Sequence, residues 1–296
     1  MRYTLELLVA VLSSGVLNGL VYALVGLAFV LIYRVDGVVN LAIGECAMLG
    51  ALLGVHLHND VGLPLIVAFG GVVLLGSSIG VFTEVGILRR MRRRDPLRIL
   101  ILTFGLALVL HSIARLIWST DLYSLPTFPA VPNVIRLGVG RAVLPGQFVW
   151  IAALAFFVFV AWGAILRRTH LGRDLRAVSD DREVAEAMGI RASRKVLGAY
   201  IAACALGAIA GFFVSPVLFM TYAGGTLLGV KGLIAALVGG LLRPMGALVG
   251  GLVLGIAEAA TAGYYRADFK DVTVFGILIV ILLLRPQGIL PTAEAA

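Results

Sequence analysis

Charged residues are scarce in this sequence. They make up 14% of the 296 residues, whereas 60% are hydrophobic, and the mean hydropathy is +1.04. Soluble domains carry about 25% charged residues, so the composition excludes an ordinary soluble protein. Sustained alternation of polar and apolar residues is also missing, which argues against a membrane β-barrel. The sequence therefore predicts an all-α protein that crosses a membrane several times.

Cysteine and the common catalytic motifs are also scarce or absent. The two cysteines, Cys46 and Cys204, lie in apolar segments without metal-ligand spacing, so neither a disulfide framework nor a zinc site is expected. The histidines His56 and His58 are two residues apart, which on a helix points them to different faces. H-E-x-x-H and the phosphate loop G-x-x-x-x-G-K-[ST] do not occur. We therefore predict that the chain is not an enzyme and holds no metal.

What the sequence does contain is a series of apolar runs, each long enough or nearly so to cross a hydrocarbon core of about 20 helical residues. They cover residues 7–32, 63–88, 99–118, 148–166 and 272–284. With the interrupted runs between them, we expect about eight transmembrane helices forming a single transmembrane domain over residues 1–296. The first run is interpreted as a retained span rather than a removed signal peptide.

The net charge of +8 comes from basic residues that gather in two places. One is segment 167–195, and the other is the cluster Arg89, Arg90, Arg92, Arg93, Arg94 and Arg98. Basic residues of membrane proteins concentrate in cytoplasmic loops, which explains the charge without nucleic-acid binding and leaves room for contact with anionic membrane lipid. If both segments are cytoplasmic, two spans lie between them, with the loop 119–145 outside.

Two apolar regions are interrupted in ways that ordinary spans are not. In the first, Asp36-Gly37 signals a turn, and Asn40 can cap a helix that restarts at Leu41. In the second, Arg243-Pro244 divides two glycine-rich apolar pieces. We therefore predict broken or re-entrant segments near residues 34–45 and 239–246, which are tolerated only where protein or a water-filled cavity covers the freed backbone.

Small residues four apart recur and favour close packing of helices in lipid. The pairs are Gly15 with Gly19, Gly50 with Gly54, Gly207 with Gly211, Gly246 with Gly250, and Gly251 with Gly255. Packing within one subunit is the simpler interpretation, and dimerisation through one of these faces is the alternative.

A few strongly polar groups lie inside the apolar stretches: Asn18, Asn40, Glu45, Glu84 and Glu258. Buried carboxylates in lipid normally face the bundle interior, a partner or a water-filled path. Glu45 follows Asn40 on the first turns of the restarted helix, where the helix N-terminus favours a negative charge. It is either a polar element of a solute path or a structural carboxylate bonded to nearby backbone or to Asn18. For Glu84 a local ion pair with the arginines is favoured, and for Glu258 the sequence decides nothing.

The segment 171–190, LGRDLRAVSDDREVAEAMGI, is the longest strongly charged passage. Asp180 as N-cap, Glu183 three residues later and Gly189 as stop predict one short helix. Its apolar face would consist of Val184, Ala187 and Met188. Since so short a helix is marginal in water, that face should dock on the bundle or on another protein.

Four passages together resemble one family, the branched-chain amino acid permeases of ABC importers, of the LivH type. EVAEAMGI at 183–190, preceded by LGRDLRA, resembles the loop that such permeases insert into a groove of the ATPase subunit. NGLVYALVGLAFVLIYRVDGVVNLAIGE at 18–45 resembles the first span and the N-x-A-x-G-E element. GALVGGLVLGIAEA at 246–259 and KDVTVFGILIVILLLRPQGIL at 270–290 resemble the late glycine-rich region and the final span. They occur in the family's order over most of the chain.

The resemblance implies a permease subunit that moves leucine-, isoleucine- or valine-like solutes inward through a bacterial or archaeal cytoplasmic membrane. It implies no cofactor in this chain, because two partner ABC ATPases bind the ATP. A second permease subunit of the LivM type, or a second copy, and an extracytoplasmic solute-binding protein complete the complex. Segment 167–195 would be the cytoplasmic coupling loop, with Arg173, Glu183, Glu186, Met188 and Gly189 at the ATPase. Asn18, Asn40 and Glu45 are the candidates for the translocation path.

The sequence departs from the family pattern at two places, and it leaves three alternative functions open. Ile43 replaces the histidine usual before the Gly-Glu pair, and Arg243-Pro244 replaces a small, glycine-bearing turn. The cargo could instead be urea or a short amide. The chain could also be a channel or secondary transporter without an ATPase, which the broken helices would suit but the short charged helix would not. A membrane scaffold would leave the intramembrane carboxylates without a role.

Overall fold

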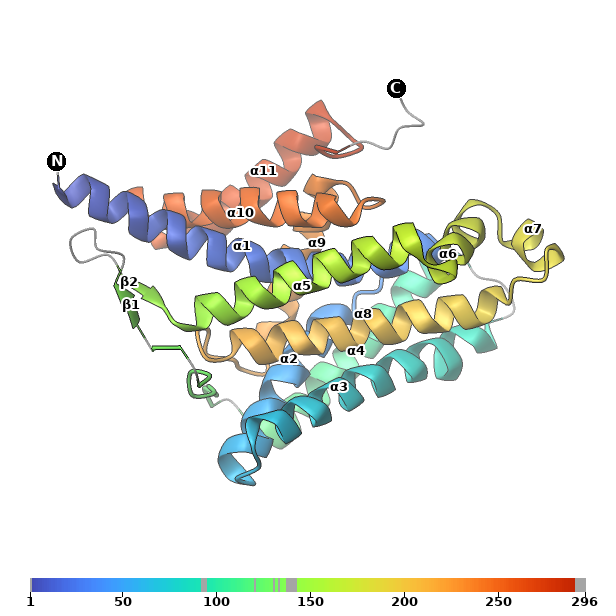
Figure 1. Cartoon of the computed structure of the whole chain (residues 1–296), viewed down its shortest axis with the longest axis horizontal. Helices are drawn as coiled ribbons and strands as arrows, with labels where there is room; N and C mark the ends of the chain where they lie inside the picture. The colour runs from blue at the N-terminus through green and yellow to red at the C-terminus, as the bar shows by residue number, and fades with distance from the viewer. Residues whose placement is uncertain are drawn as a thin grey trace.

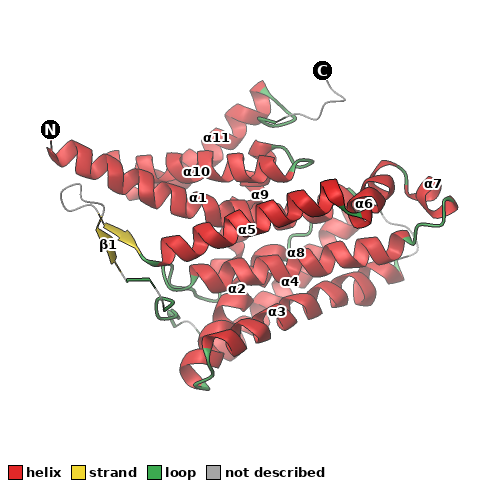
Figure 2. Cartoon of the chain, viewed as in Figure 1, coloured by secondary structure: helices red, strands yellow, loops and turns green. Residues whose placement is uncertain are grey.

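The computed structural model describes residues 2–91, 95–119, 121–129, 131–132, 134–136 and 143–290, and almost all of them belong to helices (Figure 2). The helices are α1 (Arg2–Asp36), α2 (Ile43–Val55), α3 (Leu65–Val81), α4 (Pro96–Trp118), α5 (Gln147–Arg168), α6 (His170–Asp180), α7 (Arg182–Ala187), α8 (Ala192–Val214), α9 (Gly224–Gly239), α10 (Pro244–Tyr264) and α11 (Lys270–Leu284). The strands β1 (Val134–Arg136) and β2 (Val143–Pro145) pair antiparallel. Short π-helical turns at His56–Asp60 and Phe82–Ile87 extend α2 and α3.

Six of the described helices are long and apolar enough to cross a membrane: α1, α3 with its extension to Arg90, α4, α5, α8 and α10. The helix α9 is apolar but has 16 residues, about 24 Å at 1.5 Å per residue, which is shorter than a hydrocarbon core of about 30 Å. The predicted all-α membrane fold is confirmed, whereas the predicted count of eight spans is not.

The first helix is the centre of the bundle. Residues 21–32 of α1 are all buried, and α8, α9 and α10 pack around them. The crossing with α10 depends on glycine: a Cβ on Gly251 would lie 2.5 Å from the carbonyl oxygen of Gly19, and one on Gly15 would lie 2.8 Å from Cα of Ile256. The two backbones are therefore in contact. In lipid, such close packing lets helices associate without large apolar side chains at the crossing.

The other glycine pairs also serve contacts inside the chain. A Cβ on Gly50 would overlap the backbone of Ala208, and one on Gly211 would overlap the backbone of Ala47. These two contacts bring α2 against α8. The packing of these pairs within one subunit is thus confirmed.

The long helices run between two ends of the molecule (Figure 1). At one end lie the start of α1 and the β1–β2 ribbon; we call it the hairpin end. At the other lie α6, α7, the end of α3 and the start of α4. We call it the basic end, because Arg89 and Arg90 follow α3 and Arg98 lies in the first turn of α4. Arg92, Arg93 and Arg94 of the predicted cluster lie outside the described residues. The two spans expected between the basic segments are α4 and α5.

Both predicted interruptions are present. The first helix ends at Asp36, Gly37 has φ +69°, and an extended stretch leads to α2, which begins at Ile43 rather than Leu41. The difference arises because Asn40 precedes the helix: its Oδ1 accepts a hydrogen bond from the N–H of Ala42 at 3.0 Å and closes a turn there.

The second interruption is a tight turn between α9 and α10. Gly240 has φ +105°, and Pro244 occupies the first turn of α10, where its missing N–H does no harm. Leu242 of this turn borders a cavity with Arg34 and Arg182, which places the turn at the basic end. Residues near the C-terminus cover the turn, since the N–H of Ile289 donates to the carbonyl of Val238 at 2.8 Å.

Candidate functional site

The charged segment after α5 contains two helices, and the second, α7, is the predicted short helix. The helix α6 continues through Asp180, and the chain breaks at Asp181, which has φ −154° and ψ 115°. Asp181 Oδ1 accepts hydrogen bonds from the N–H groups of Glu183 at 2.8 Å and Val184 at 3.1 Å. The prediction of Asp180 as N-cap was therefore wrong by one residue, because the backbone of Asp180 is still helical.

The predicted stop at Gly189 is confirmed by its backbone. Gly189 has φ +85°, and its N–H donates to the carbonyl of Glu186 at 3.0 Å. The N–H of Ile190 donates to the carbonyl of Ala185, also at 3.0 Å. This pair of bonds is a Schellman motif, which needs a left-handed residue that glycine supplies without strain. With a cap and a stop, the six residues of α7 form a complete helix.

The predicted apolar face of α7 does not dock on its own bundle. Val184 is 55% exposed, Met188 is 75% exposed and Ala187 is exposed as well. The small side chain of Ala185 faces inward instead. Glu183 and Glu186 are exposed beside this face, and Glu186 Oε1 lies 3.3 Å from Nε of Arg182. The helix lies at the basic end (Figure 1). Three apolar side chains and two carboxylates of this segment are exposed there.

In contrast to α7, α6 is tied firmly to the bundle. Leu175 and Val178 are buried, and the guanidinium of Arg176 donates to the carbonyl of Leu166 at 3.2 Å. Asp174 forms an ion pair of 2.7 Å with Lys195 at the start of α8. The predicted partner residue Arg173 is exposed on the outer face of α6, where its guanidinium contacts the ring of His170 at 2.7 Å. A force on α7 would thus reach α5 and α8 through α6.

Glu45 lies in the first turn of α2 and is 3% exposed. Its Oε1 accepts a hydrogen bond of 2.7 Å from the hydroxyl of Thr226, in the first turn of α9. Its Oε2 has no hydrogen-bond partner among the described residues and lies 3.8 Å from Nδ1 of His111. Glu45 borders a cavity of about 330 Å³ between α1, α2, α4 and α9. Its bonded partner is thus Thr226, not Asn18.

The other predicted path residues are placed differently from one another. Asn40 is fully buried just before α2, and its Nδ2 has no hydrogen-bond partner among the described residues. Asn18 is half-buried on α1 and does not line the cavity at Glu45. Glu84 is buried in the π-helical turn after α3, and its pairing with the arginines stays a prediction.

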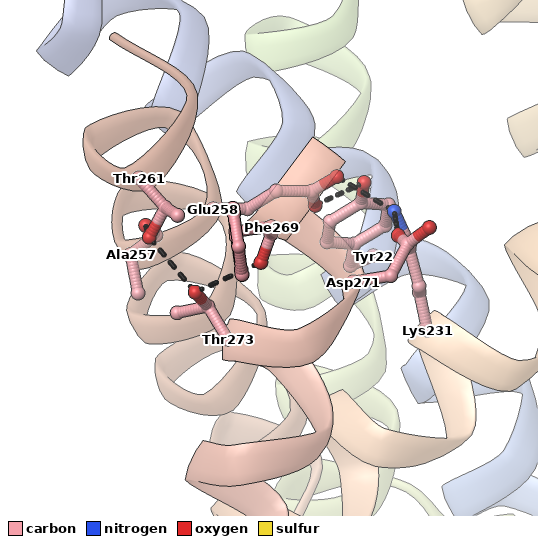
Figure 3. Close-up of polar contacts among 8 residues, drawn as sticks. All are labelled: Tyr22, Lys231, Ala257, Glu258, Thr261, Phe269, Asp271 and Thr273. Atoms are coloured by element: carbon pink, nitrogen blue, oxygen red, sulfur yellow. Dashed lines mark hydrogen bonds and ion pairs between the residues drawn. The ribbon is translucent and has the colours of Figure 1, made fainter. Parts of the chain in front are cut away.

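A buried charge network joins α1, α9, α10 and α11 (Figure 3). Lys231 Nζ lies 2.6 Å from Glu258 Oε1 and 2.8 Å from Asp271 Oδ1. The hydroxyl of Tyr22 donates to Glu258 Oε2 at 2.7 Å. A second contact between α10 and α11 joins the hydroxyls of Thr261 and Thr273 at 3.0 Å. Buried charges in a membrane protein are stable only when paired. Lys231 and Glu258 are almost fully buried, and the second carboxylate at the same ammonium, that of Asp271, is 43% exposed.

Lys231 is the residue that sequence reasoning missed. It is the lone basic residue of the apolar stretch 224–239 and is 5% exposed. The signal was available, since an intramembrane lysine in an apolar run calls for a carboxylate partner. Glu258 was noted as a candidate, but 27 residues separate it from Lys231, so only the packing of α9 on α10 pairs them.

The chain is thus a multi-span membrane protein with broken helices and paired charges in its interior. Residues 11–283 match the family model described as branched-chain amino acid transport system / permease component, and the chain belongs to that family.

Similar proteins extend over nearly the whole chain. The permease protein BraD of a high-affinity branched-chain amino acid transport system in Pseudomonas aeruginosa is 30% identical over 295 residues, covering 96% of this chain and 95% of BraD. The corresponding LivH of Escherichia coli K12 is 30% identical, covering 95% and 94%. The fructose import permease protein FruG of Bifidobacterium longum is 23% identical, covering 86% and 76%.

The fold is also similar to that of a solved structure. It is that of PsaBC from Streptococcus pneumoniae in complex with Fab, with a TM-score of 0.51 and 14% sequence identity. The match covers 93% of this chain and 91% of the other. At this identity the likeness supports the helical arrangement and carries nothing on substrate.

Proposed function

We propose that the chain is the membrane-spanning permease subunit of an ABC importer that moves branched-chain amino acids into the cell. Family membership and the relatives BraD and LivH support the cargo. The energy would come from two partner ATPase subunits, which bind the ATP. A second permease subunit, of the LivM type or a copy of this chain, and an extracytoplasmic solute-binding protein would complete the complex.

The observation that carries this proposal is the exposed face of α7. Val184 and Met188 lie on a helix whose two ends are satisfied by Asp181 and by the turn at Gly189. A helix of six residues is marginal in water, so a fully capped one with an exposed apolar face indicates a docking element. Because basic residues gather at this end, we assign it to the cytoplasm, where the ATPases bind.

In this account Glu183, Glu186, Met188 and Gly189 make or shape the ATPase contact, and Arg173 lies on the flank as a charge partner. Closure of the ATPases on ATP would push α7, and α6 would pass the movement to α5 and α8 through Arg176 and Asp174. The spans would tilt as rigid bodies and open the path to the other side. The path itself would run past Asn40 and Glu45 at the broken helix, with Asn18 on the first span.

The test is purification of the tagged protein from its native host in mild detergent, with identification of the proteins that accompany it. We expect an ATPase with a phosphate-loop motif to accompany the unaltered chain and to be lost from a Glu183→Lys/Glu186→Lys variant that still enters the membrane. If a known ABC complex survives the same detergent and neither sample recovers an ATPase, the proposal fails in favour of a secondary transporter.

A further inference from the structure

The cavity beside Glu45 has the composition of a binding site for a small solute that carries both a charged and an apolar group. Its volume of about 330 Å³ falls within the range of roughly 300–1,000 Å³ typical of small-molecule sites. Most of its wall is apolar, formed by Phe29, Leu41, Phe104, Leu108, Val230 and Leu233. Glu45 is the carboxylate in that wall.

The carboxylate of Glu45 is only half satisfied. Thr226 holds Oε1, whereas Oε2 has no hydrogen-bond partner among the described residues and lies 3.8 Å from Nδ1 of His111. A buried acceptor without a donor is unfavourable, and more so when it carries a charge. A ligand ammonium would supply the missing donor through a charge-assisted hydrogen bond.

The surrounding backbone keeps this carboxylate in place. Glu45 and Thr226 lie in the first turns of α2 and α9, and helix N-termini stabilise negative charge. A Cβ on Gly225 would lie 2.8 Å from Oε2, so glycine at this position leaves that oxygen its space. The N-terminal ends of α2 and α9 therefore meet at the carboxylate of Glu45 on the cavity wall.

Two basic side chains lie on α4. The ring of His111 borders the cavity and packs edge-on against Tyr222, with ring centroids 5.2 Å apart. One turn further, the guanidinium of Arg115 lies 5.7 Å from the centre of the Tyr222 ring. The cavity thus combines a carboxylate, an imidazole and an apolar wall, which together suit an amino acid with an aliphatic side chain.

We propose that Glu45 binds the ammonium group of the transported amino acid in this cavity, with the aliphatic side chain on the apolar wall. The inference rests on the proposed function and adds that the permease itself, and not only a binding protein, selects solutes that carry an amine. Neutral solutes such as urea or a sugar could not supply a charge-assisted hydrogen bond to Oε2.

Protection of an introduced cysteine tests the ligand without altering Glu45. Leu108→Cys places a thiol on the cavity wall, and Ile117→Cys places one on the exposed surface of the same helix, while both native cysteines are buried. L-leucine and 3-methylbutylamine, which lacks the carboxylate, should slow maleimide labelling of Leu108→Cys but not of Ile117→Cys. The amine-free 4-methylpentanoate should not. Equal protection by all three compounds, or by none at saturating concentration, would overturn the inference.

Variants of Glu45 and Thr226 then test whether Glu45 is the residue that binds the ammonium group. In the Leu108→Cys background, Glu45→Gln should weaken protection by leucine about tenfold or more, as expected for loss of a hydrogen bond to a charged group. Thr226→Val, which frees Oε1 but keeps the charge, should weaken it less. Unchanged protection in Glu45→Gln that elutes as a monodisperse species would contradict the assignment.

Failure here can be told apart from failure of the proposed function. If the unaltered chain and the Glu45→Gln variant both recover the ATPase but leucine gives no protection, the importer assignment stands and the ammonium site is wrong. If the unaltered chain recovers no ATPase, the importer assignment fails irrespective of the labelling.

Discussion

The ammonium group of Lys231 on α9 lies 2.6 Å from the carboxylate of Glu258 on α10. Both side chains are almost fully buried, so the pair sits where neither charge can reach bulk water. Removing one partner of such a pair leaves an uncompensated buried charge, whereas removing both does not.

We therefore predict that Lys231→Met lowers the free energy of unfolding by about 3–5 kcal/mol, and that Lys231→Met/Glu258→Gln recovers part of this loss. Asp271, the second carboxylate at Lys231, keeps its charge in the double variant, but its side chain is 43% exposed. Thermal unfolding in one detergent provides the comparison. A single variant as stable as the unaltered chain, or a double variant no better than the single, would show that the pair is not held as described.

Replacement of Gly251 by leucine should prevent α10 from packing on α1, because a Cβ there would meet the carbonyl oxygen of Gly19 at 2.5 Å. We expect loss of the monodisperse species in size-exclusion chromatography. Gly105→Leu on α4 is the matched control, since nothing lies within 4 Å of its Cβ position, and leucine also favours helix there. If both variants behaved alike, the close crossing of α1 and α10 would be in doubt.

Gly189→Val should disrupt the end of α7, because Gly189 has φ +85° and the left-handed region costs about 1–2 kcal/mol for residues with a Cβ. Gly189→Asn is the control, because asparagine tolerates this region better than other residues. We expect ATPase co-purification to fall with valine and to persist with asparagine, at equal membrane levels. Equal recovery of the ATPase with both variants would show that docking does not depend on the left-handed turn at Gly189.

The cap of α7 offers a further test. Asp181→Ala should weaken the helix by about 1 kcal/mol, since the carboxylate that accepts from Glu183 and Val184 is lost. Asp180→Ala should leave the cap intact. Faster amide exchange at residues 183 and 184 in the first variant alone is the expected result, and the reverse order would restore Asp180 as the cap.

Much of the fold could be predicted from the sequence because lipid imposes a simple pattern. Apolar length located α4 and α5, and the glycine, asparagine and proline signals located both interruptions. Hydropathy could not say which spans are central: the apolar windows of α1 and α3 have the same mean hydropathy of 2.3, yet 83% of the first and 28% of the second are buried. Lipid and protein interiors favour the same side chains, so only the packing of the helices distinguishes a central span from a lipid-facing one.

The features of the candidate site also divide into those that the sequence predicts and those that it does not. The stop at Gly189 follows from local backbone chemistry and was predictable. The N-cap of α7 is Asp181 rather than the predicted Asp180, because the side chains of these two adjacent aspartates offer the same hydrogen-bond acceptors. The partners of Glu45 and Glu258 are 181 and 27 residues away. Such pairs come from helix packing, and sequence position does not reveal them.

The most direct test of the account is the energy source of transport. The purified complex of this chain with its accompanying proteins would be placed in proteoliposomes, and uptake of radiolabelled leucine would be measured with and without ATP, in the presence of ionophores that collapse ion gradients. We predict that accumulation requires ATP and persists with ionophores. Accumulation without ATP that the ionophores abolish would contradict the importer assignment and show a gradient-driven transporter instead.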